Sequence, residues 1–200
     1  MTNDAKQMSN DAKQMTNDAK QTMNFLKITL VGLVLLAGPR LTMAQYTAMN
    51  TGVAQKNAAL IQKNNALPVS SANGKTAVAF FNALLNARDV AFLKTIIAPD
   101  IAFRNSLGVT VNGIDGLTAM MGKIDGNFAG FRIEITEVIT EGDAVFLKAN
   151  FSGTHSSAFL APAATNTPFT VPGFASFVIK SGKVMSGFSI ADFYQITKQI

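Results

Sequence analysis

The chain has 200 residues, of which 48% are hydrophobic and 14% are charged. This length suits one folded domain with a substantial apolar core, and the composition excludes a chain that is disordered throughout. Because cysteine is absent, disulfide frameworks, thiolate zinc sites and thiol nucleophiles are excluded, and the single histidine, His155, excludes a histidine-cluster metal site.

The net charge of +5 does not predict a nucleic-acid partner. The basic residues are scattered singly, with no stripe or run that could follow a phosphate backbone. The sequence also lacks a glycine-rich phosphate loop and a serine-elbow motif. We therefore expect no nucleic-acid and no nucleotide partner.

Residues 1–22 form a repetitive polar tail. Residues 1–21 are three copies of the heptad Met-Thr-Asn-Asp-Ala-Lys-Gln, with Ser9 as the one substitution. The repeat offers only Met and Ala as apolar positions, which is too little for a coiled-coil seam. We expect a flexible tail, or coding sequence upstream of a start at Met23.

Residues 23–44 have the order of a secretory signal peptide. Lys27 precedes the apolar run Ile28–Gly38, which is shorter than the ~20 residues that cross a bilayer. Small residues, Thr42 and Ala44, stand where a signal peptidase would read them. We expect cleavage after Ala44, a secreted or periplasmic protein and no stable membrane span after cleavage; the alternatives are an N-terminal membrane anchor or a buried helix.

Residues 45–74 read as a flexible linker because they are rich in Ala, Asn, Gln, Thr and Ser. Fourteen of the fifteen phenylalanines lie at or beyond Phe80, so the material for a core is concentrated after the linker. The folded domain is expected over residues 75–200.

Within this domain, hydrophobic periodicity predicts helices first and long strands afterwards, an α+β order. A curved antiparallel sheet wrapped over the helices would leave a central apolar pocket. The expected helices are 76–87, 90–97 and 113–121, and the expected strands are 101–105, 109–112, 131–136, 144–154, 169–180 and 184–194.

The last expected strand carries a candidate base. By two-residue alternation, Asp192 shares a face with Phe188, Ile190 and Tyr194. A carboxylate among apolar neighbours is desolvated, which favours its protonated form and suits a base that works near neutral pH. The alternative is an aspartate at the sheet edge that caps a turn or pairs with a lysine.

Further side chains are candidates for the pocket. Alternation in strand 144–154 places Phe151 and His155 on its apolar side, where the imidazole could bind a substrate carbonyl or position Asp192; equally, backbone groups or Thr154 could satisfy it. Arg104 and Asn105 could place a donor at the pocket mouth that polarises an oxyanion, or simply meet solvent. The Tyr194 hydroxyl could donate a hydrogen bond, or the ring could pack in the core.

Taken together, residues 76–199 resemble the SnoaL-like polyketide cyclase (ester cyclase) family of the nuclear transport factor 2-like superfamily, whose domains are cone-shaped. The resemblance rests on Glu141-Gly142-Asp143, Gly153-Thr154-His155, Gly182-Lys183-Val184, and then Asp192 and Gln199. It implies a hydrophobic pocket, an intramolecular aldol reaction without metal or organic cofactor, and Asp192 as acid and base. Phe188 stands where the family usually has tryptophan, and Ser157 and Ala161 stand where it usually has glycines.

Two functions follow from these observations. One is a cofactor-independent cyclase or isomerase of a hydrophobic carbonyl compound, with Asp192 and His155 catalytic and a substrate-binding set made of Arg104, Phe188, Tyr194 and Phe151. The other is a non-catalytic small-molecule-binding or dimerisation module, since one fold hosts many functions. In either case we expect a hydrophobic small molecule as partner, and a homodimer, which an exposed sheet face around Phe174 and Val178 would favour.

Overall fold

The structure is a computed structural model that describes residues 42–161 and 163–200. Residues 49–200 form one compact unit, which holds the sheet and the candidate site. The polar tail and residues 23–41 of the expected signal peptide lie outside the described residues. In the part that is described, no helix has the length and apolar character needed to cross a membrane.

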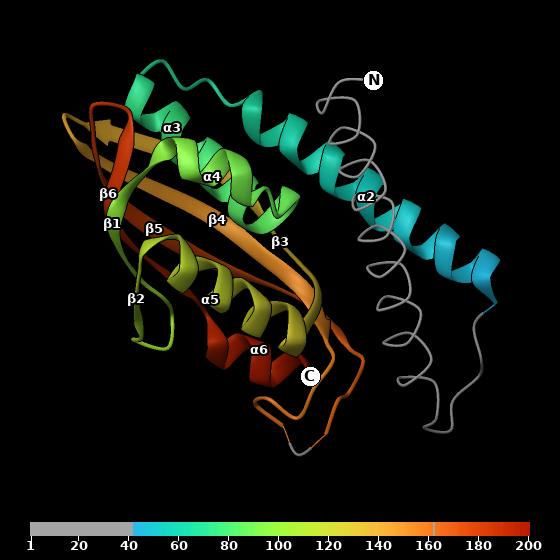
Figure 1. Ribbon diagram of the computed structural model, residues 1–200. Helices are drawn as coiled ribbons and strands as arrows, with labels where there is room; N and C mark the ends of the chain where they lie inside the picture. Colours follow the sequence, from blue (N-terminus) through green and yellow to red (C-terminus); the bar gives the residue numbers. More distant parts are fainter. Residues whose placement is uncertain (1–41, 162) are drawn as a thin grey trace, which may run out of the picture. The chain divides into compact units, whose positions relative to one another are not determined.

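Helices α3, α4 and α5 lie against one face of the sheet, as Figure 1 shows. Ser71 caps α3, where its side chain accepts the Gly74 N–H, and Asp89 caps α4 through the Phe92 N–H. The helical segments are α2 (Met43–Asn65), α3 (Ala72–Phe81), the π-helical turn η1 (Asn82–Ala87), α4 (Val90–Ile96), α5 (Gly113–Asn127) and α6 (Phe193–Gln199).

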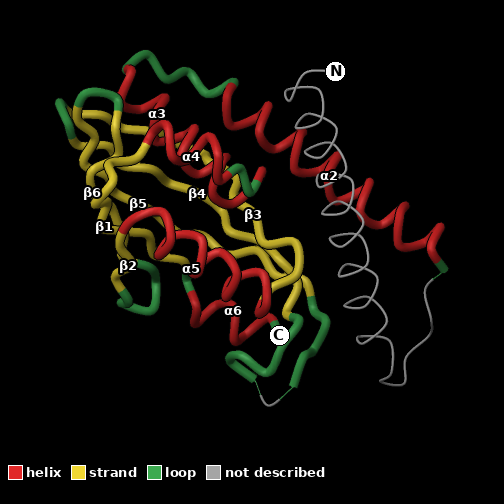
Figure 2. The backbone as a smooth tube through the Cα atoms, viewed as in Figure 1, coloured by secondary structure: helices red, strands yellow, loops and turns green. Residues whose placement is uncertain are grey.

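The sheet has six strands in the order β2-β1-β6-β5-β4-β3 and is not closed into a barrel (Figure 2). Four of its strand pairs are antiparallel, but β1 and β6 pair in parallel, so the expected all-antiparallel sheet is corrected at this point. The strands are β1 (Ile97–Arg104), β2 (Thr110–Asn112), β3 (Phe128–Glu141), β4 (Ala144–His155), β5 (Pro168–Lys180) and β6 (Lys183–Ala191).

The core lies between the helices and the inner face of the sheet. In β4, burial follows the expected alternation, because Leu147, Phe151 and His155 all point inward and are buried. Phe80 and Phe81 of α3 meet this face, and the Phe81 and Phe177 ring centroids lie 5.2 Å apart. Packed rings of this kind account for the concentration of phenylalanine after residue 79.

Most of helix α2 lies in the segment 45–74 that was expected to be a linker, and its C-terminal end reaches the edge of the sheet. Asn64 is 1% exposed, and its side-chain oxygen accepts the Ile135 N–H at 2.9 Å while its nitrogen donates to the Ile133 carbonyl at 3.2 Å. Asn86 of η1 accepts the Ile133 N–H at 2.9 Å. Since β3 is an edge strand, these asparagines satisfy backbone groups that no neighbouring strand pairs.

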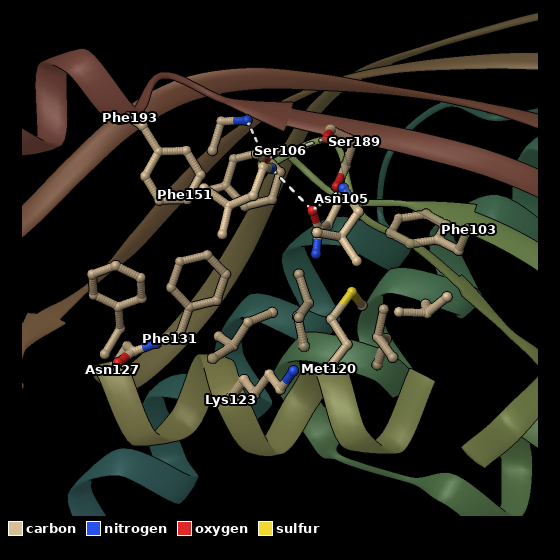
Figure 3. Close-up of a pocket in the computed structure, with 18 of the residues that line it drawn as sticks. Phe103, Asn105, Ser106, Met120, Lys123, Asn127, Phe131, Phe151, Ser189 and Phe193 are labelled. Atoms are coloured by element: carbon tan, nitrogen blue, oxygen red, sulfur yellow. Dashed lines mark hydrogen bonds between the residues drawn. The ribbon is translucent and has the colours of Figure 1, made fainter. Parts of the chain in front are cut away.

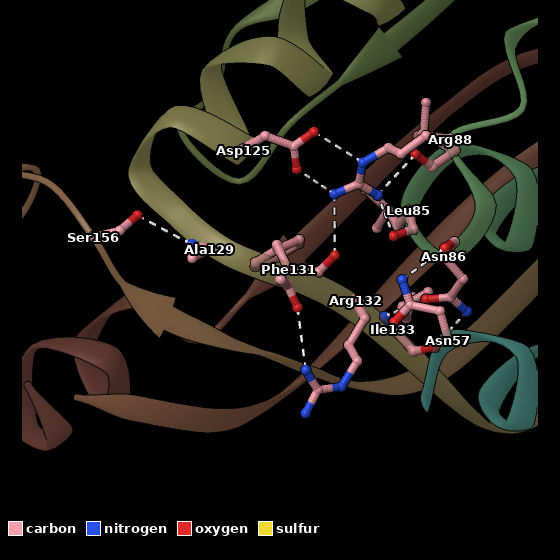
Figure 4. A network of polar contacts seen from close by, with 12 residues as sticks. Asn57, Leu85, Asn86, Arg88, Asp125, Ala129, Phe131, Arg132, Ile133 and Ser156 are labelled. Carbon is pink, nitrogen blue, oxygen red and sulfur yellow. Dashed lines mark hydrogen bonds and ion pairs between the residues drawn. The ribbon is translucent and has the colours of Figure 1, made fainter. Parts of the chain in front are cut away.

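Arg88 also binds the backbone of the edge strand β3, as Figure 4 shows. Its guanidinium donates to the Phe131 carbonyl at 3.0 Å, to the Leu84 carbonyl at 3.1 Å and to the Leu85 carbonyl. It also pairs with both carboxylate oxygens of Asp125. The backbone of Arg88 is left-handed, with φ of 57°. The side-chain bonds of Arg88 to the carbonyls of Leu84 and Phe131 hold this turn after η1 in place.

Candidate functional site

A cavity of about 600 Å³ lies between α5, the inner face of the sheet and the loop that joins β1 to β2 (Figure 3). This volume is in the range of pockets for small organic ligands. Aromatic and aliphatic side chains form most of the lining. The residues that line the cavity are Phe81, Leu84, Leu85, Phe103, Asn105, Ser106, Leu107, Val109, Val111, Gly116, Ala119, Met120, Lys123, Ile124, Gly126, Asn127, Phe128, Phe131, Phe151, Phe159, Ser189, Ala191, Phe193 and Ile196.

Helix α5 supplies one wall. Ala119, Met120, Lys123 and Asn127 recur at spacings of three and four residues, which places them on one helical face. The sequence predicted this helix only over residues 113–121. The last two residues of this face were therefore missed, although the period continues without a break.

Aromatic rings form the opposite wall. Phe131 and Phe151 are stacked with their centroids 6.0 Å apart, and Phe81 meets Phe103 edge-on at 6.4 Å. The position of Phe151 depends on Gly173 of the neighbouring strand, because a Cβ there would lie 2.6 Å from Phe151 Cε2. Of the substrate-binding residues predicted from the sequence, Phe151 lines this cavity.

Asn105 and Ser106 bring polar groups to the cavity from the loop after β1. The Asn105 side-chain oxygen accepts the N–H groups of Leu107 and Val109 at 3.0 and 3.1 Å, which fixes the turn. The Ser106 hydroxyl accepts the Ala191 N–H at 2.9 Å and donates to the Ser189 carbonyl at 3.3 Å. These bonds tie the loop to the end of β6.

Asp192 lies after β6 rather than within it. Its side chain accepts the Gln195 N–H at 3.0 Å and so caps the N-terminus of α6. It is half-buried, and it is not among the residues that line the cavity. The structure therefore gives Asp192 the turn-capping position that was the alternative to a pocket carboxylate.

The residues of β6 that were expected to share one face do not all lie on the same side of the sheet. Val184 is buried in the core, whereas Phe188, which is 36% exposed, and Ile190 lie on the outer face. A register shift between β5 and β6 at Val178/Ile179 inserts a bulge, and an odd shift moves every following side chain to the other face. Phe188 therefore lies outside the cavity, and Ser189 lies inside.

Tyr194 and Arg104 also lie outside the cavity lining. Tyr194 is 66% exposed on α6, where Lys198 Nζ lies 5.2 Å from its ring centroid. Arg104 is exposed, and its Nε donates to the Gly108 carbonyl at 3.4 Å. Its neighbour Asn105 is the residue that reaches the cavity.

His155 is fully buried, with 0% exposure, and holds the loop between β4 and β5. Nδ1 accepts the Thr165 N–H at 3.2 Å and contacts the Thr165 hydroxyl at 3.0 Å, while Nε2 lies 2.6 Å from the Phe159 carbonyl. These partners assign the proton to Nε2, since only a nitrogen that bears hydrogen can donate to a carbonyl. His155 is not a lining residue, but it positions Phe159, which is one.

The lining is poor in titratable groups. Among its described members none is Asp, Glu or His, and the charged member is Lys123. Within the described ranges, no group of three or more potential His, Asp or Glu ligands is placed to hold a metal ion. The cavity can therefore enclose an apolar body and offer it hydrogen-bond donors.

Comparison with known proteins agrees with this architecture. Residues 75–200 match the SnoaL-like polyketide cyclase family. The chain belongs to this family. It has the α+β architecture of the nuclear transport factor 2-like fold, with a curved, unclosed sheet that leaves room for the cavity. No curated protein matches the sequence.

Three solved structures illustrate the shared fold. A protein described as a candidate SnoaL-like polyketide cyclase from Jannaschia sp. CCS1 has a TM-score of 0.58 and 21% identity, covering 66% of this chain and 94% of its own. Another from Shewanella putrefaciens CN-32 has a TM-score of 0.59 and 14% identity, covering 66% and 97%. IdmH of Streptomyces antibioticus, described as a candidate polyketide cyclase, has a TM-score of 0.57 and 20% identity, covering 64% and 96%.

Proposed function

We propose that this protein binds a hydrophobic small molecule in the cavity and that binding, rather than acid–base turnover, is its function. One observation carries the proposal: the described cavity lining contains neither a carboxylate nor an imidazole. Aspartate, glutamate and histidine are the side chains that most often act as general acids and bases, and such a group must lie within hydrogen-bond reach of the reacting atom. The aromatic wall and the volume of about 600 Å³ suit the enclosure of an apolar ligand.

Filling the cavity tests this proposal. Ala119 lies on the wall that α5 provides, so Ala119→Trp should occupy ligand space. We expect this change to lower the affinity for a neutral fluorescent probe, N-phenyl-1-naphthylamine, at least about tenfold, a loss of ~1.4 kcal/mol. Ala91→Trp, at an exposed position of α4 outside the lining, is the matched control and should leave the affinity unchanged. Equal probe binding by both variants and the parent chain would reject the proposal.

The cyclase function expected from the family is the second candidate, and Asp192 distinguishes the two. A catalytic base would accelerate exchange of the α-protons of an apolar ketone such as 4-phenylbutan-2-one in D₂O, and Asp192→Asn would abolish the acceleration. Because this carboxylate bonds to the Gln195 N–H, we expect exchange at the rate of buffer in both proteins. Accelerated exchange that is lost in Asp192→Asn would establish the cyclase candidate instead.

A homodimer through the outer face of the sheet is part of the proposal. The rings of Phe146 and Phe174 stack at 5.6 Å, and those of Phe174 and Phe188 meet edge-on at 6.2 Å. Contiguous apolar surface of this kind is typical of an interface. The exposed large apolar residues on strands β3, β4, β5 and β6 are Ile139, Phe146, Phe174, Val178, Met185, Phe188 and Ile190. Sedimentation of the parent chain as a dimer and of Phe174→Asp as a monomer would support the dimer; a monomeric parent chain would contradict it.

Export is the remaining component of the proposal, and it rests on the sequence of residues 23–44. Cleavage after Ala44 would leave Gln45 as the first residue and would keep most of α2 with the domain. The mass of the natural protein, measured after purification from its own cells, would establish the processing site. A protein that retains Met23 or Lys27 would instead favour the membrane-anchored alternative.

A further inference from the structure

The polar atoms of the cavity lining differ in whether they are free to donate or to accept a hydrogen bond. The Asn105 side-chain oxygen is already occupied by two backbone N–H groups, so its remaining hydrogen-bonding capacity is concentrated in Nδ2. In Figure 3 this nitrogen points into the cavity from the loop after β1. An amide nitrogen only donates, so a ligand group placed there must accept.

The other fixed oxygen atoms of the lining are also engaged. Asn127 Oδ1 accepts the Ser157 hydroxyl at 2.8 Å, and the Ser106 hydroxyl both donates and accepts within the protein. The Ser189 hydroxyl can rotate and serve either role. The balance of polar groups therefore lies on the donor side.

Lys123 adds positive charge to this balance. It lies on the cavity wall of α5, is exposed, and forms no ion pair with a carboxylate in the part of the chain that the structure describes. The nearby carboxylate of Asp125 is held by Arg88. The ammonium group is therefore available to a ligand, and its charge is uncompensated within the lining.

From these observations we propose that the ligand is an amphiphilic organic anion, with an apolar body against the phenylalanine wall and a carboxylate that meets the donors of Asn105 and Lys123. This inference rests on the proposed binding function and adds the charge of the ligand to it. An ionised acceptor forms a stronger hydrogen bond than a neutral one, and an ammonium at the cavity mouth favours an anion over a cation.

Three probes with the same apolar tail separate charge from hydrophobic binding: dodecanoate, dodecan-1-ol and dodecyltrimethylammonium. Calorimetry below the micelle concentrations should give dodecanoate about tenfold higher affinity than dodecyltrimethylammonium. Lys123→Gln should lower dodecanoate affinity about fivefold and leave dodecan-1-ol unchanged. The matched control is Lys94→Gln, an exposed position of α4 outside the lining.

Asn105→Asp is the sharper test, because it replaces the donor with an oxygen of the same size. One carboxylate oxygen can still accept the two turn N–H groups, so the loop is kept, while the other presents negative charge to the cavity. We expect at least about a tenfold loss of dodecanoate affinity and improved binding of dodecyltrimethylammonium. Asn112→Asp adds the same charge at an exposed site outside the lining and should change neither.

The outcomes distinguish this inference from the function on which it rests. If dodecan-1-ol binds but dodecanoate binds no more tightly than dodecyltrimethylammonium, the anion preference is wrong and the apolar binding function stands. If none of the three probes binds and N-phenyl-1-naphthylamine does not bind either, both are wrong. Should Asn105→Asp fail to fold by circular dichroism, the Lys123→Gln comparison decides: an unchanged dodecanoate affinity would overturn the inference.

Discussion

The side-chain oxygen of Asn64 accepts the backbone N–H of Ile135 at 2.9 Å, across 71 positions of sequence. Through this bond the end of α2 protects an edge of the sheet that would otherwise be open. A segment whose composition is typical of a linker is therefore joined to the domain by specific polar contacts. The contact makes the contribution of α2 to stability measurable.

Asn64→Ala should destabilise the domain by about 2 kcal/mol, because it leaves the Ile135 N–H unpaired and removes a donor to Ile133 and Asn82. Urea denaturation followed by circular dichroism measures this change. Asn73→Ala is the control, since the half-buried Asn73 donates a solvent-exposed bond to the Gly142 carbonyl; it should cost less than ~1 kcal/mol. Equal losses of unfolding free energy in the two variants would show that the buried bonds of Asn64 stabilise the domain no more than the exposed bond of Asn73.

Arg88 and Asp125 form an ion pair whose two members should contribute unequally. Asp125→Ala removes only a partly exposed pair and should cost less than ~1 kcal/mol. Arg88→Gly also removes the bonds to the carbonyls of Leu84 and Phe131, but it relieves the left-handed backbone. We expect Arg88→Gly to cost about 1–2 kcal/mol more than Asp125→Ala in urea denaturation. A smaller cost for Arg88→Gly would mean that relief of the backbone outweighs the lost bonds.

His155→Ala should loosen the loop between β4 and β5. The change removes the acceptor for the Thr165 N–H and the donor to the Phe159 carbonyl, so proteolysis within the loop should accelerate at least about tenfold. Mass spectrometry of the fragments locates the cut. Thr165→Val is the control, because it keeps the backbone N–H and removes only the hydroxyl; it should accelerate cleavage less. Cleavage at the parental rate in His155→Ala would contradict a role for this histidine in holding the loop.

Two glycines should respond in opposite directions to the same added methyl group. A Cβ at Gly173 would overlap the Ile190 carbonyl oxygen and lie 2.6 Å from Phe151 Cε2, so Gly173→Ala should cost about 2–3 kcal/mol and displace both the β6 backbone and a cavity residue. A Cβ at Gly122 of α5 would meet nothing within 4 Å, so Gly122→Ala should stabilise by about 0.5–1 kcal/mol through helix propensity. Thermal unfolding of the two variants measures both signs. A Gly173→Ala protein as stable as the parent chain would show that Phe151 and the β6 backbone at Ile190 can both move without cost.

The sequence allowed the fold class, the element order and the inner face of β4 to be predicted, because long alternating or helical runs record which side is buried. The limits are equally specific. Alternation cannot reveal the bulge beside Val184, and so it could not place Phe188 on the outer face. Nor could it show that the chain turns into a helix at Asp192, because an N-cap aspartate and a strand aspartate look alike without coordinates.

The cavity was harder to predict than the fold. Lys123 follows the helical period of α5, but the helix predicted from the sequence ended at Met121. Asn105 was recognised at the pocket mouth together with Arg104, yet which of the two side chains reaches the interior depends on the turn geometry of the loop. Distances across strands determine such choices, and a linear pattern does not contain them.

The parallel pairing of β1 with β6 has a consequence for how the protein assembles. Residues near 103 must find partners near 187, so the wall that carries Asn105 is completed only after the later hairpins are in register. Long-range pairings of this kind slow folding, because a large loop must close before they form. A ligand would therefore recognise the finished domain and not its precursors, and its whole binding free energy would shift the equilibrium towards the native state.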